Sequence, residues 1–320
     1  MIGKSGFQFM DLFYKYGLYV VLVVLVVVFS LINPKFFTIP NGINILAQTV
    51  TVGIASCGLT FVVITRGIDL SMGSVMYITS VLITLLAGKG LGLVGAFALA
   101  MLIGIVIGAA NGFFIAKLRI SAIIVTLATL YAIRGLGIVI GGTGLIYFPS
   151  EISDALVFTR LFDTVPKLIF VLVAVMIITQ VTLSRTIFGR QLYAIGNNAE
   201  AAKTSGVNVT RNLFLSYIVC GALGGLAGLV SGAQVGGISS TFAAGQEFVI
   251  IPATVLGGVS LFGGKGKAFP GAFTGVLITM CIENGLIMAK TDVYFYTMIR
   301  GVIIFVAVML DCLQNKGEHR

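Results

Sequence analysis

Residues 91–116 read LGLVGAFALAMLIGIVIGAANGFFIA and contain no charged side chain. An α-helix needs about 20 consecutive apolar residues to cross a bilayer, and this run is longer. Comparable runs recur along the chain, in which 58% of the 320 residues are hydrophobic and 10% are charged. A soluble domain carries roughly 25% charged residues. The runs do not alternate between apolar and polar residues as barrel strands do, so the sequence predicts an all-α polytopic membrane protein.

We expect about ten transmembrane helices in a single transmembrane domain that covers residues 1–320. With the N-terminus in the cytoplasm, most Lys and Arg residues fall in cytoplasmic segments, and this asymmetry predicts that both termini are cytoplasmic. The main cytoplasmic loop then covers about 185–212, and the loop 142–166 faces outward. The predicted spans are 17–33, 42–65, 71–88, 92–116, 120–141, 166–184, 213–234, 247–262, 269–289 and 293–312.

Glycines recur at every fourth position in two of these spans. Such spacing lets membrane helices approach closely. We expect this packing to lie within one subunit rather than between subunits. The repeats are Gly104, Gly108 and Gly112 in the first span, and Gly224, Gly228, Gly232 and Gly236 in the second.

Several kinds of chemistry are excluded by missing residues. The only histidine is His319, so the paired histidines of zinc proteases are absent. The stretch GGVSLFGGKGKAF resembles a phosphate-binding loop, but Gly266 rather than Ser or Thr follows Lys265. The net charge of +9 reflects the cytoplasmic loops and does not indicate nucleic acid. We expect no catalytic residue, no metal, no cofactor and no nucleotide site in this chain.

Two glycine-rich interruptions break the apolar pattern, at TRGIDLSMGS (65–74) and LGGVSLFGGKGKAFPGAF (256–273). Asp69 is placed to cap the helix that restarts after the first interruption. The interruptions favour broken helices beside a transport pathway, although for Asp69 alone an ordinary cytoplasmic turn with a capping aspartate and a paired arginine is the slightly better explanation. The candidate pathway residues are Asp69, Ser71, Gly73, Ser260, Gly263, Gly264 and Asn284.

Charged residues within the spans are few, and such groups face the interior of a bundle by default. The candidates are Arg134, Glu283 and Arg300, with Glu247 at the end of a span. An ion-coupled transporter would use a carboxylate among them, whereas simple anchoring explains carboxylates near span ends.

The stretch FGRQLYAIGNNAEAAKTSGVNVTR (188–211) is the longest without an apolar run. Asn197 or Asn198 can cap a short helix that has Glu200 in its first turn, Lys203 near its end and Gly206 after it. So short a helix is not stable alone. We therefore expect it to dock on a cytoplasmic protein rather than to act as a passive connector.

The segment AIGNNAEAAKTSGVNV resembles the cytoplasmic coupling loop of permease subunits of ribose-type monosaccharide importers, which belong to the ATP-binding-cassette (ABC) class. Further stretches of the chain are similar to segments of that family and stand in the family's order. They are RGIDLSMGS, TLATLYAIRGL, VLGGVSLFGGKG, and ENGLIMAK with the later YTMIRGVIIFVAVMLD. The resemblance covers about 41–311. It implies a permease domain of the bacterial inner membrane that works with ATPase subunits, an extracytoplasmic sugar-binding protein and a second permease copy, as a homodimer or a close heterodimer.

The resemblance also implies roles for individual residues. The short helix would sit in a cleft of the ATPase and transmit its closure to the spans. The residues that match the coupling loop are Gly196, Asn197, Asn198, Glu200, Ala201, Ala202, Ser205 and Gly206.

The chain departs from the family's pattern at four positions. The family often has glycine where Arg66 stands, proline where Ser121 stands and aspartate where Val249 stands, and Pro252 is unusual. These departures bear on the substrate more than on membership. Two alternatives stay open: a branched-chain amino-acid ABC permease, and an ion-coupled secondary transporter that uses a carboxylate such as Glu283.

Overall fold

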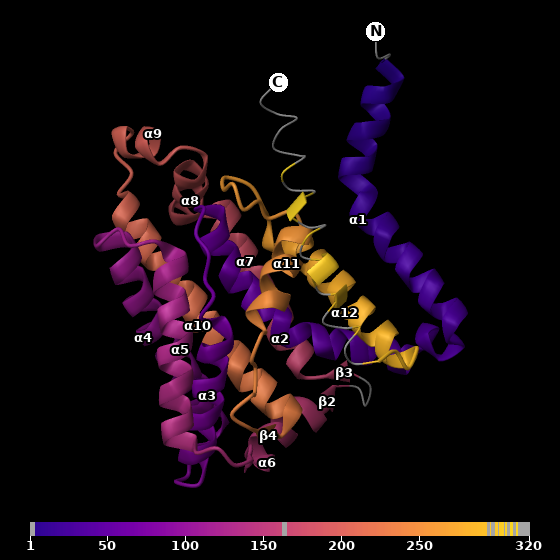
Figure 1. Ribbon diagram of the computed structural model, residues 1–320, viewed down its shortest axis with the longest axis vertical. Helices are drawn as coiled ribbons and strands as arrows, with labels where there is room; N and C mark the ends of the chain where they lie inside the picture. Colours follow the sequence, from indigo (N-terminus) through magenta and orange to yellow (C-terminus); the bar gives the residue numbers. More distant parts are fainter. Residues whose placement is uncertain are drawn as a thin grey trace.

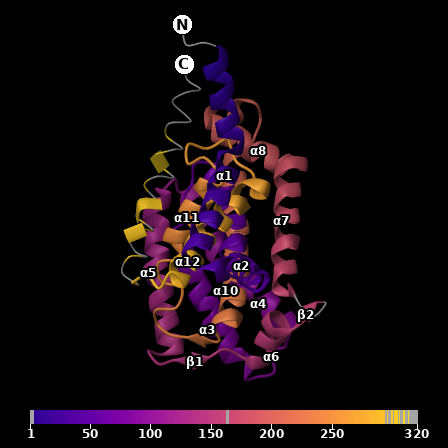
Figure 2. The same ribbon diagram turned by 90° about the vertical axis from the view of Figure 1, so that its right-hand side faces the viewer.

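Long apolar helices make up most of the chain in the computed structural model, which describes residues 4–161, 165–292 and scattered positions between 295 and 312. Figure 1 shows them as a bundle of upright helices, and Figure 2 shows the same bundle from the side. The α-helices are α1 Lys4–Ile32, α2 Ile39–Ile64, α3 Met72–Ala87, α4 Leu93–Gly112, α5 Ala122–Gly141, α6 Ser150–Ser153, α7 Leu168–Arg185, α8 Ile187–Asn197, α9 Ala199–Thr204, α10 Val209–Val235, α11 Glu247–Leu256 and α12 Phe273–Met288.

Shorter elements join these helices. A 3-10 turn, η1, covers Pro34–Phe37, and π-helical turns cover Phe113–Lys117 (η2), Asp154–Phe158 (η3) and Ala268–Ala272 (η4). The strands have two residues each: β1 Ile146–Tyr147, β2 Arg160–Leu161, β3 Val165–Pro166 and β4 Gly237–Ile238.

Nine of the predicted spans coincide with helices. Within the described residues, six helices are long and apolar enough to cross a membrane, and three shorter apolar helices cover Gly17–Ile32, Met72–Ala87 and Glu247–Leu256. The predicted span 293–312 lies largely outside the described residues. The all-α membrane class is therefore confirmed.

Helices α2 and α10 form the centre of the bundle. The most apolar part of α2 is 89% buried, whereas that of α5 is only 17% buried. A helix that is apolar on all sides belongs in such a core. The two helices are also joined by hydrogen bonds, because Thr51 Oγ1 donates to Gln234 Oε1 and Gln234 Nε2 donates to Ala47 O, each over 2.7 Å.

Both glycine repeats pack within the chain, as predicted. A Cβ atom on Gly104 would overlap the carbonyl of Gly221 on α10, and a Cβ atom on Gly228 would lie 2.7 Å from the carbonyl oxygen of Met76 on α3. Helix α10 thus presents one small-residue face to α4 and another to α3. Gly236 differs from the rest of its repeat, because it takes φ 71° and ends α10.

The two ends of the bundle have different neighbours. At one end, β1 pairs antiparallel with β4, with Ile146 opposite Ile238, and this joins the loop 142–166 to the end of α10. At the other end lie α8 and α9 (Figure 1). Gly112, just before η2, packs against Phe214 near the start of α10, so the basic turn 117–119 also belongs to this end.

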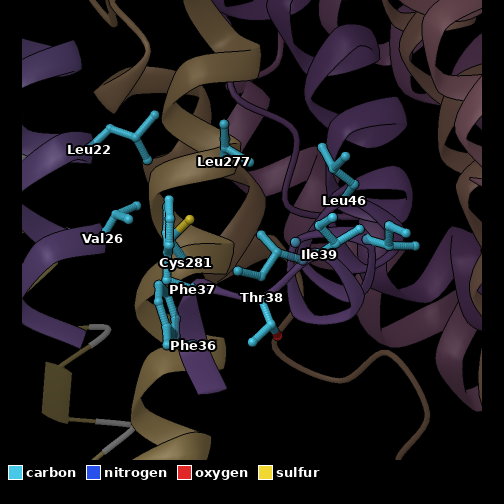
Figure 3. Close-up of a pocket in the computed structure, with 12 residues that line it drawn as sticks. Leu22, Val26, Phe36, Phe37, Thr38, Ile39, Leu46, Leu277 and Cys281 are labelled. Carbon is cyan, nitrogen blue, oxygen red and sulfur yellow. The ribbon is translucent and has the colours of Figure 1, made fainter. Parts of the chain in front are cut away.

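Helix α1 stands apart from the bundle at the right of Figure 1. An apolar cavity of about 540 Å³ lies between α1, α2 and α12, with Leu22 and Val26 on one side and Leu277 and Cys281 on another (Figure 3). Its lining offers few hydrogen-bonding groups to a hydroxylated molecule.

Candidate functional site

The loop between α7 and α10 contains the short helix expected from the sequence. Asn198 Oδ1 accepts from the backbone N–H of Ala201 over 3.0 Å and so caps α9. Glu200 lies in the first turn, Lys203 in the last, and Gly206 reverses the chain at φ 85°. These features confirm the predicted start and stop of the helix.

Helix α9 is largely uncovered by the rest of the chain. Of the eight residues assigned to coupling, only Gly196 and Ala202 are buried, and Gly196 packs against the backbone of Ile64 and Gly264. The other six are exposed and available to a partner surface: Asn197, Asn198, Glu200, Ala201, Ser205 and Gly206.

The C-terminal end of α8 meets the first glycine-rich interruption through Arg66. The Arg66 guanidinium donates from Nε to the carbonyl of Gly196 over 2.7 Å and from Nη2 to the carbonyl of Asn197 over 2.9 Å. The last carbonyls of a helix have no partner inside it, and a cation favours that end of the dipole. Arg66 takes φ 67°, a conformation that favours glycine, so its side-chain contacts offset a backbone cost.

The second interruption meets α8 at the same place. Gly264 N–H donates to the carbonyl of Ile64 over 2.8 Å, and a Cβ atom on Gly196 would overlap both groups. Tyr193 Oη donates to the carbonyl of Gly266 over 2.6 Å. Burial raises the pKa of Tyr193, so the phenol stays protonated as a donor.

This junction of α8 with segments 64–66 and 263–266 contains several of the predicted pathway residues. Gly263 takes φ 80° and its N–H donates to the carbonyl of Ser260 over 3.0 Å, which forms a tight turn against α8. A cavity of about 470 Å³ opens there, lined by Tyr193, Lys265, Lys267 and glycines. The second interruption therefore lies beside the loop between α7 and α10.

Asp69 does not cap α3 as expected. The helix begins at Met72 with Ser71 as its N-cap residue, and Asp69 lies two positions earlier. Asp69 Oδ1 instead accepts from the backbone N–H of Ser71 over 2.8 Å and from its hydroxyl over 2.6 Å. A local side-chain turn of this kind competes with a cap, which explains the difference.

A chain of buried hydrogen bonds continues from this turn. Asn111 Nδ2 on α4 donates to Ser71 Oγ over 3.0 Å, and Thr129 Oγ1 on α5 donates to Asn111 Oδ1 over 2.6 Å. Asp69, Ser71 and Asn111 are each 1% exposed. The sequence does not mark Asn111 and Thr129 as site residues, because single polar residues inside apolar runs give no local signal.

Among the predicted intramembrane charges, Arg134 and Glu247 lie close enough to interact electrostatically. Arg134 on α5 donates to the carbonyls of Ser240 and Phe242 over 3.1 Å each, ahead of α11. Glu247 at the start of α11 is 5% exposed, and its Oε2 has no hydrogen-bond partner among the described residues. Gly73 faces this carboxylate across the start of α3.

The remaining candidates lie elsewhere. Asn284 is buried on α12, and Glu283 beside it is half-buried. Their neighbour Gly285 packs against Phe29, so this part of α12 lies against α1. Arg300 lies outside the described residues.

Comparison with known proteins gives the family. Residues 41–308 match the family described as branched-chain amino acid transport system / permease component. The chain is 35% identical to the ribose import permease protein of Escherichia coli (strain K12) over 295 residues, which cover 91% of this chain and 92% of that protein. It is 34% identical to the ribose import permease protein of Bacillus subtilis (strain 168), over 93% of this chain and 92% of that protein.

Two further relatives are named for other sugars. The L-arabinose transport system permease protein of Escherichia coli (strain K12) is 33% identical over 99% of this chain and 96% of its own length. The D-allose transport system permease protein of the same strain is 31% identical over 98% of this chain and 96% of its own length. No solved structure matches the chain.

Proposed function

This chain belongs to the family of transport permease components that includes the ribose import permeases, and on that basis we propose that it is the transmembrane subunit of an ABC importer for a monosaccharide. The observation that carries the proposal is the likeness to ribose, arabinose and allose permeases over more than nine-tenths of the chain. The family's description mentions branched-chain amino acids. The relatives that match over most of their length are named for ribose, arabinose and allose transport, and these names favour a sugar over an amino acid as the substrate.

The protein is a multi-pass protein of the bacterial inner membrane, and its expected partners follow from its family. An ATPase subunit in the cytoplasm would supply energy, and an extracytoplasmic binding protein would deliver the sugar. We infer that ATP hydrolysis belongs to the partner, because the loop at Lys265 and Gly266 lacks the Ser or Thr of a phosphate-binding loop.

We further propose that residues 185–212 dock on the ATPase within a single permease domain that covers 1–320. Two features support this role: the exposure of most of α9, and the attachment of α8 to both glycine-rich segments. In this arrangement the end of the bundle with α8 and α9 is cytoplasmic, as are both termini, and β1 and β4 lie outside. About ten spans would complete the domain.

A second permease copy would help to enclose the sugar's path, since the cavities beside α2, one against α1 and α12 and the other against α7, are lined mainly by apolar side chains. We propose a homodimer. Two copies of the chain with different affinity tags should co-purify through either tag. Recovery of only one tag would favour a sister permease as the other subunit.

The test of the function is uptake of radiolabelled ribose, arabinose and allose into proteoliposomes. The chain is reconstituted with and without its ATPase, and binding protein and ATP are added or omitted separately. We expect uptake only when ATP and both partners are present. Uptake by the chain alone, driven by an ion gradient, would refute the proposal and direct attention to Glu247 and Glu283.

A further inference from the structure

We propose that Arg66 and a hydrogen-bonded chain through the buried Asp69, Ser71 and Asn111 and the half-buried Thr129 transmit movement of the α8–α9 loop to helix α5. This inference rests on the proposed docking of that loop on an ATPase. It adds residues that no sequence motif assigns to coupling, and it gives the direction in which the movement passes.

The first step is the contact between Arg66 and α8. Two N–H groups of one planar guanidinium hold the carbonyls of Gly196 and Asn197, the last residues before the cap of α9. A fork of this kind resists both sliding and rotation of its partner. A displacement of the end of α8 therefore pulls on Arg66.

The second step is the short backbone segment from Arg66 to Asp69. Arg66 N–H donates to the carbonyl of Val63 over 2.9 Å, and Gly67 N–H donates to that of Val62 over 3.0 Å. A Cβ atom on Gly67 would lie 2.7 Å from both Tyr217 Oη and Val62 Cγ1. Tightly packed backbone has few alternative arrangements, so the segment passes on a displacement rather than absorbing it.

The third step crosses from this segment to α5. The Thr129 hydroxyl donates to the Asn111 side chain, the Asn111 amide donates to the Ser71 hydroxyl, and the Ser71 hydroxyl donates to the Asp69 carboxylate. An unpaired polar group in a buried, apolar setting is costly, so these groups move together rather than separately. The chain thereby ties α4 and α5 to the segment that Arg66 holds.

Helix α5 is suited to receive the movement. Its most apolar part is 17% buried within this chain, and its packing is mainly on the face where Gly137 and Gly141 meet Tyr77 and Val81 of α3. Its Arg134 also holds the carbonyls of Ser240 and Phe242 in the segment ahead of α11. A shift of α5 would thus change the region between α10 and α11.

The test compares Arg66→Gly with Arg119→Gly in the assembled importer. Both arginines have positive φ values, 67° and 58°, so glycine suits either backbone. The Arg119 side chain is exposed and makes no hydrogen bond or ion pair with the described residues, which makes it the matched control. The quantity measured is sugar transported per ATP hydrolysed, at equal amounts of assembled complex. We expect about a fivefold fall for Arg66→Gly and none for Arg119→Gly.

A double-mutant cycle then tests whether the steps form one series. Thr129→Val removes the hydroxyl while keeping the side chain's shape, and Thr129→Ser keeps the hydroxyl and should restore coupling. If the steps form a series, the double variant Arg66→Gly with Thr129→Val should transport as much sugar per ATP as the more impaired single variant. If the fold losses of the two single variants multiply in the double variant, the two residues act independently and the proposed series is wrong.

Failure of the inference can be distinguished from failure of the proposed function. If wild-type complex shows no ATP-driven sugar uptake, the proposed function is wrong and the inference falls with it. If wild-type complex transports sugar and Arg66→Gly transports as much per ATP as Arg119→Gly, only the transmission through Arg66 is wrong.

Discussion

Gly228→Ala tests the packing at the centre of the bundle. The added Cβ atom would lie 2.7 Å from the carbonyl oxygen of Met76 and 2.8 Å from its Cα. Both atoms belong to the backbone of α3, so no side chain can turn away. Restoring a contact of about 3.5 Å requires the helices to separate by about 0.8 Å.

The expected loss of stability is the balance of opposing free-energy contributions. Alanine favours a helix over glycine by about 1 kcal/mol. Overpacking costs about 1–3 kcal/mol, and separation also strains the bond from Ser80 Oγ to the carbonyl of Gly228, 2.8 Å long and worth about 1 kcal/mol. We expect a net loss of about 2 kcal/mol in stability. Gly228→Leu should prevent assembly altogether.

The assay is thermal unfolding of the detergent-solubilised protein, followed by ATP-dependent uptake at a temperature where the wild type is folded. Gly42→Ala is the matched control, because a Cβ atom at Gly42 on α2 would have nothing within 4 Å. The control should unfold at or slightly above the wild-type temperature. Equal unfolding temperatures for Gly228→Ala and the wild type would refute the claim that α3 and α10 meet at backbone contact.

Three further predictions concern the loop 185–212. Replacing Glu200 or introducing bulk as Ala201→Trp should leave membrane insertion intact but uncouple ATP hydrolysis from uptake, measured as sugar per ATP; normal coupling in both would contradict the docking assignment. Asn198→Ala should destabilise α9 by about 1 kcal/mol and weaken ATPase binding in a pull-down, while Asn198→Asp should retain it. Because burial raises the pKa of Tyr193 above its usual value near 10, the phenol's contribution to stability is fully present below about pH 10 and lost as the pH rises through the higher folded-state value. Thermal unfolding of the wild type should therefore approach that of Tyr193→Phe only in strongly alkaline solution, and a constant difference would contradict the bond to Gly266.

The parts of the structure that depend on local pattern could be predicted from the sequence. Apolar length predicts the spans, and the order of Asn198, Glu200 and Gly206 predicts α9 and its ends. The four-residue spacing of glycines predicts close packing, but it does not distinguish the face of α10 that meets α3 from the face that meets α4.

The junction at α8 could not be predicted in the same way. Arg66 bonds to Gly196 across 130 positions of sequence, and no local pattern relates the two. The expectation that Asp69 caps α3 is wrong for a related reason. A carboxylate before a helix can either cap the helix or form a tight turn, and local sequence does not distinguish the two. The departure of Arg66 from the family's usual glycine was visible, but the purpose of its side chain depends on which helix end folds back against it.

The central place of α10 has a consequence for biogenesis. Chains are synthesised from the N-terminus, so α2, α3 and α4 enter the membrane before residues 209–235 leave the ribosome. Until then, the faces of Gly104 and Gly108 on α4 and of Met76 on α3 have only lipid or one another as neighbours. Membrane helices insert first and associate afterwards. A chain that stops before Val209 should insert normally yet remain loosely associated, which makes it a target for membrane proteases.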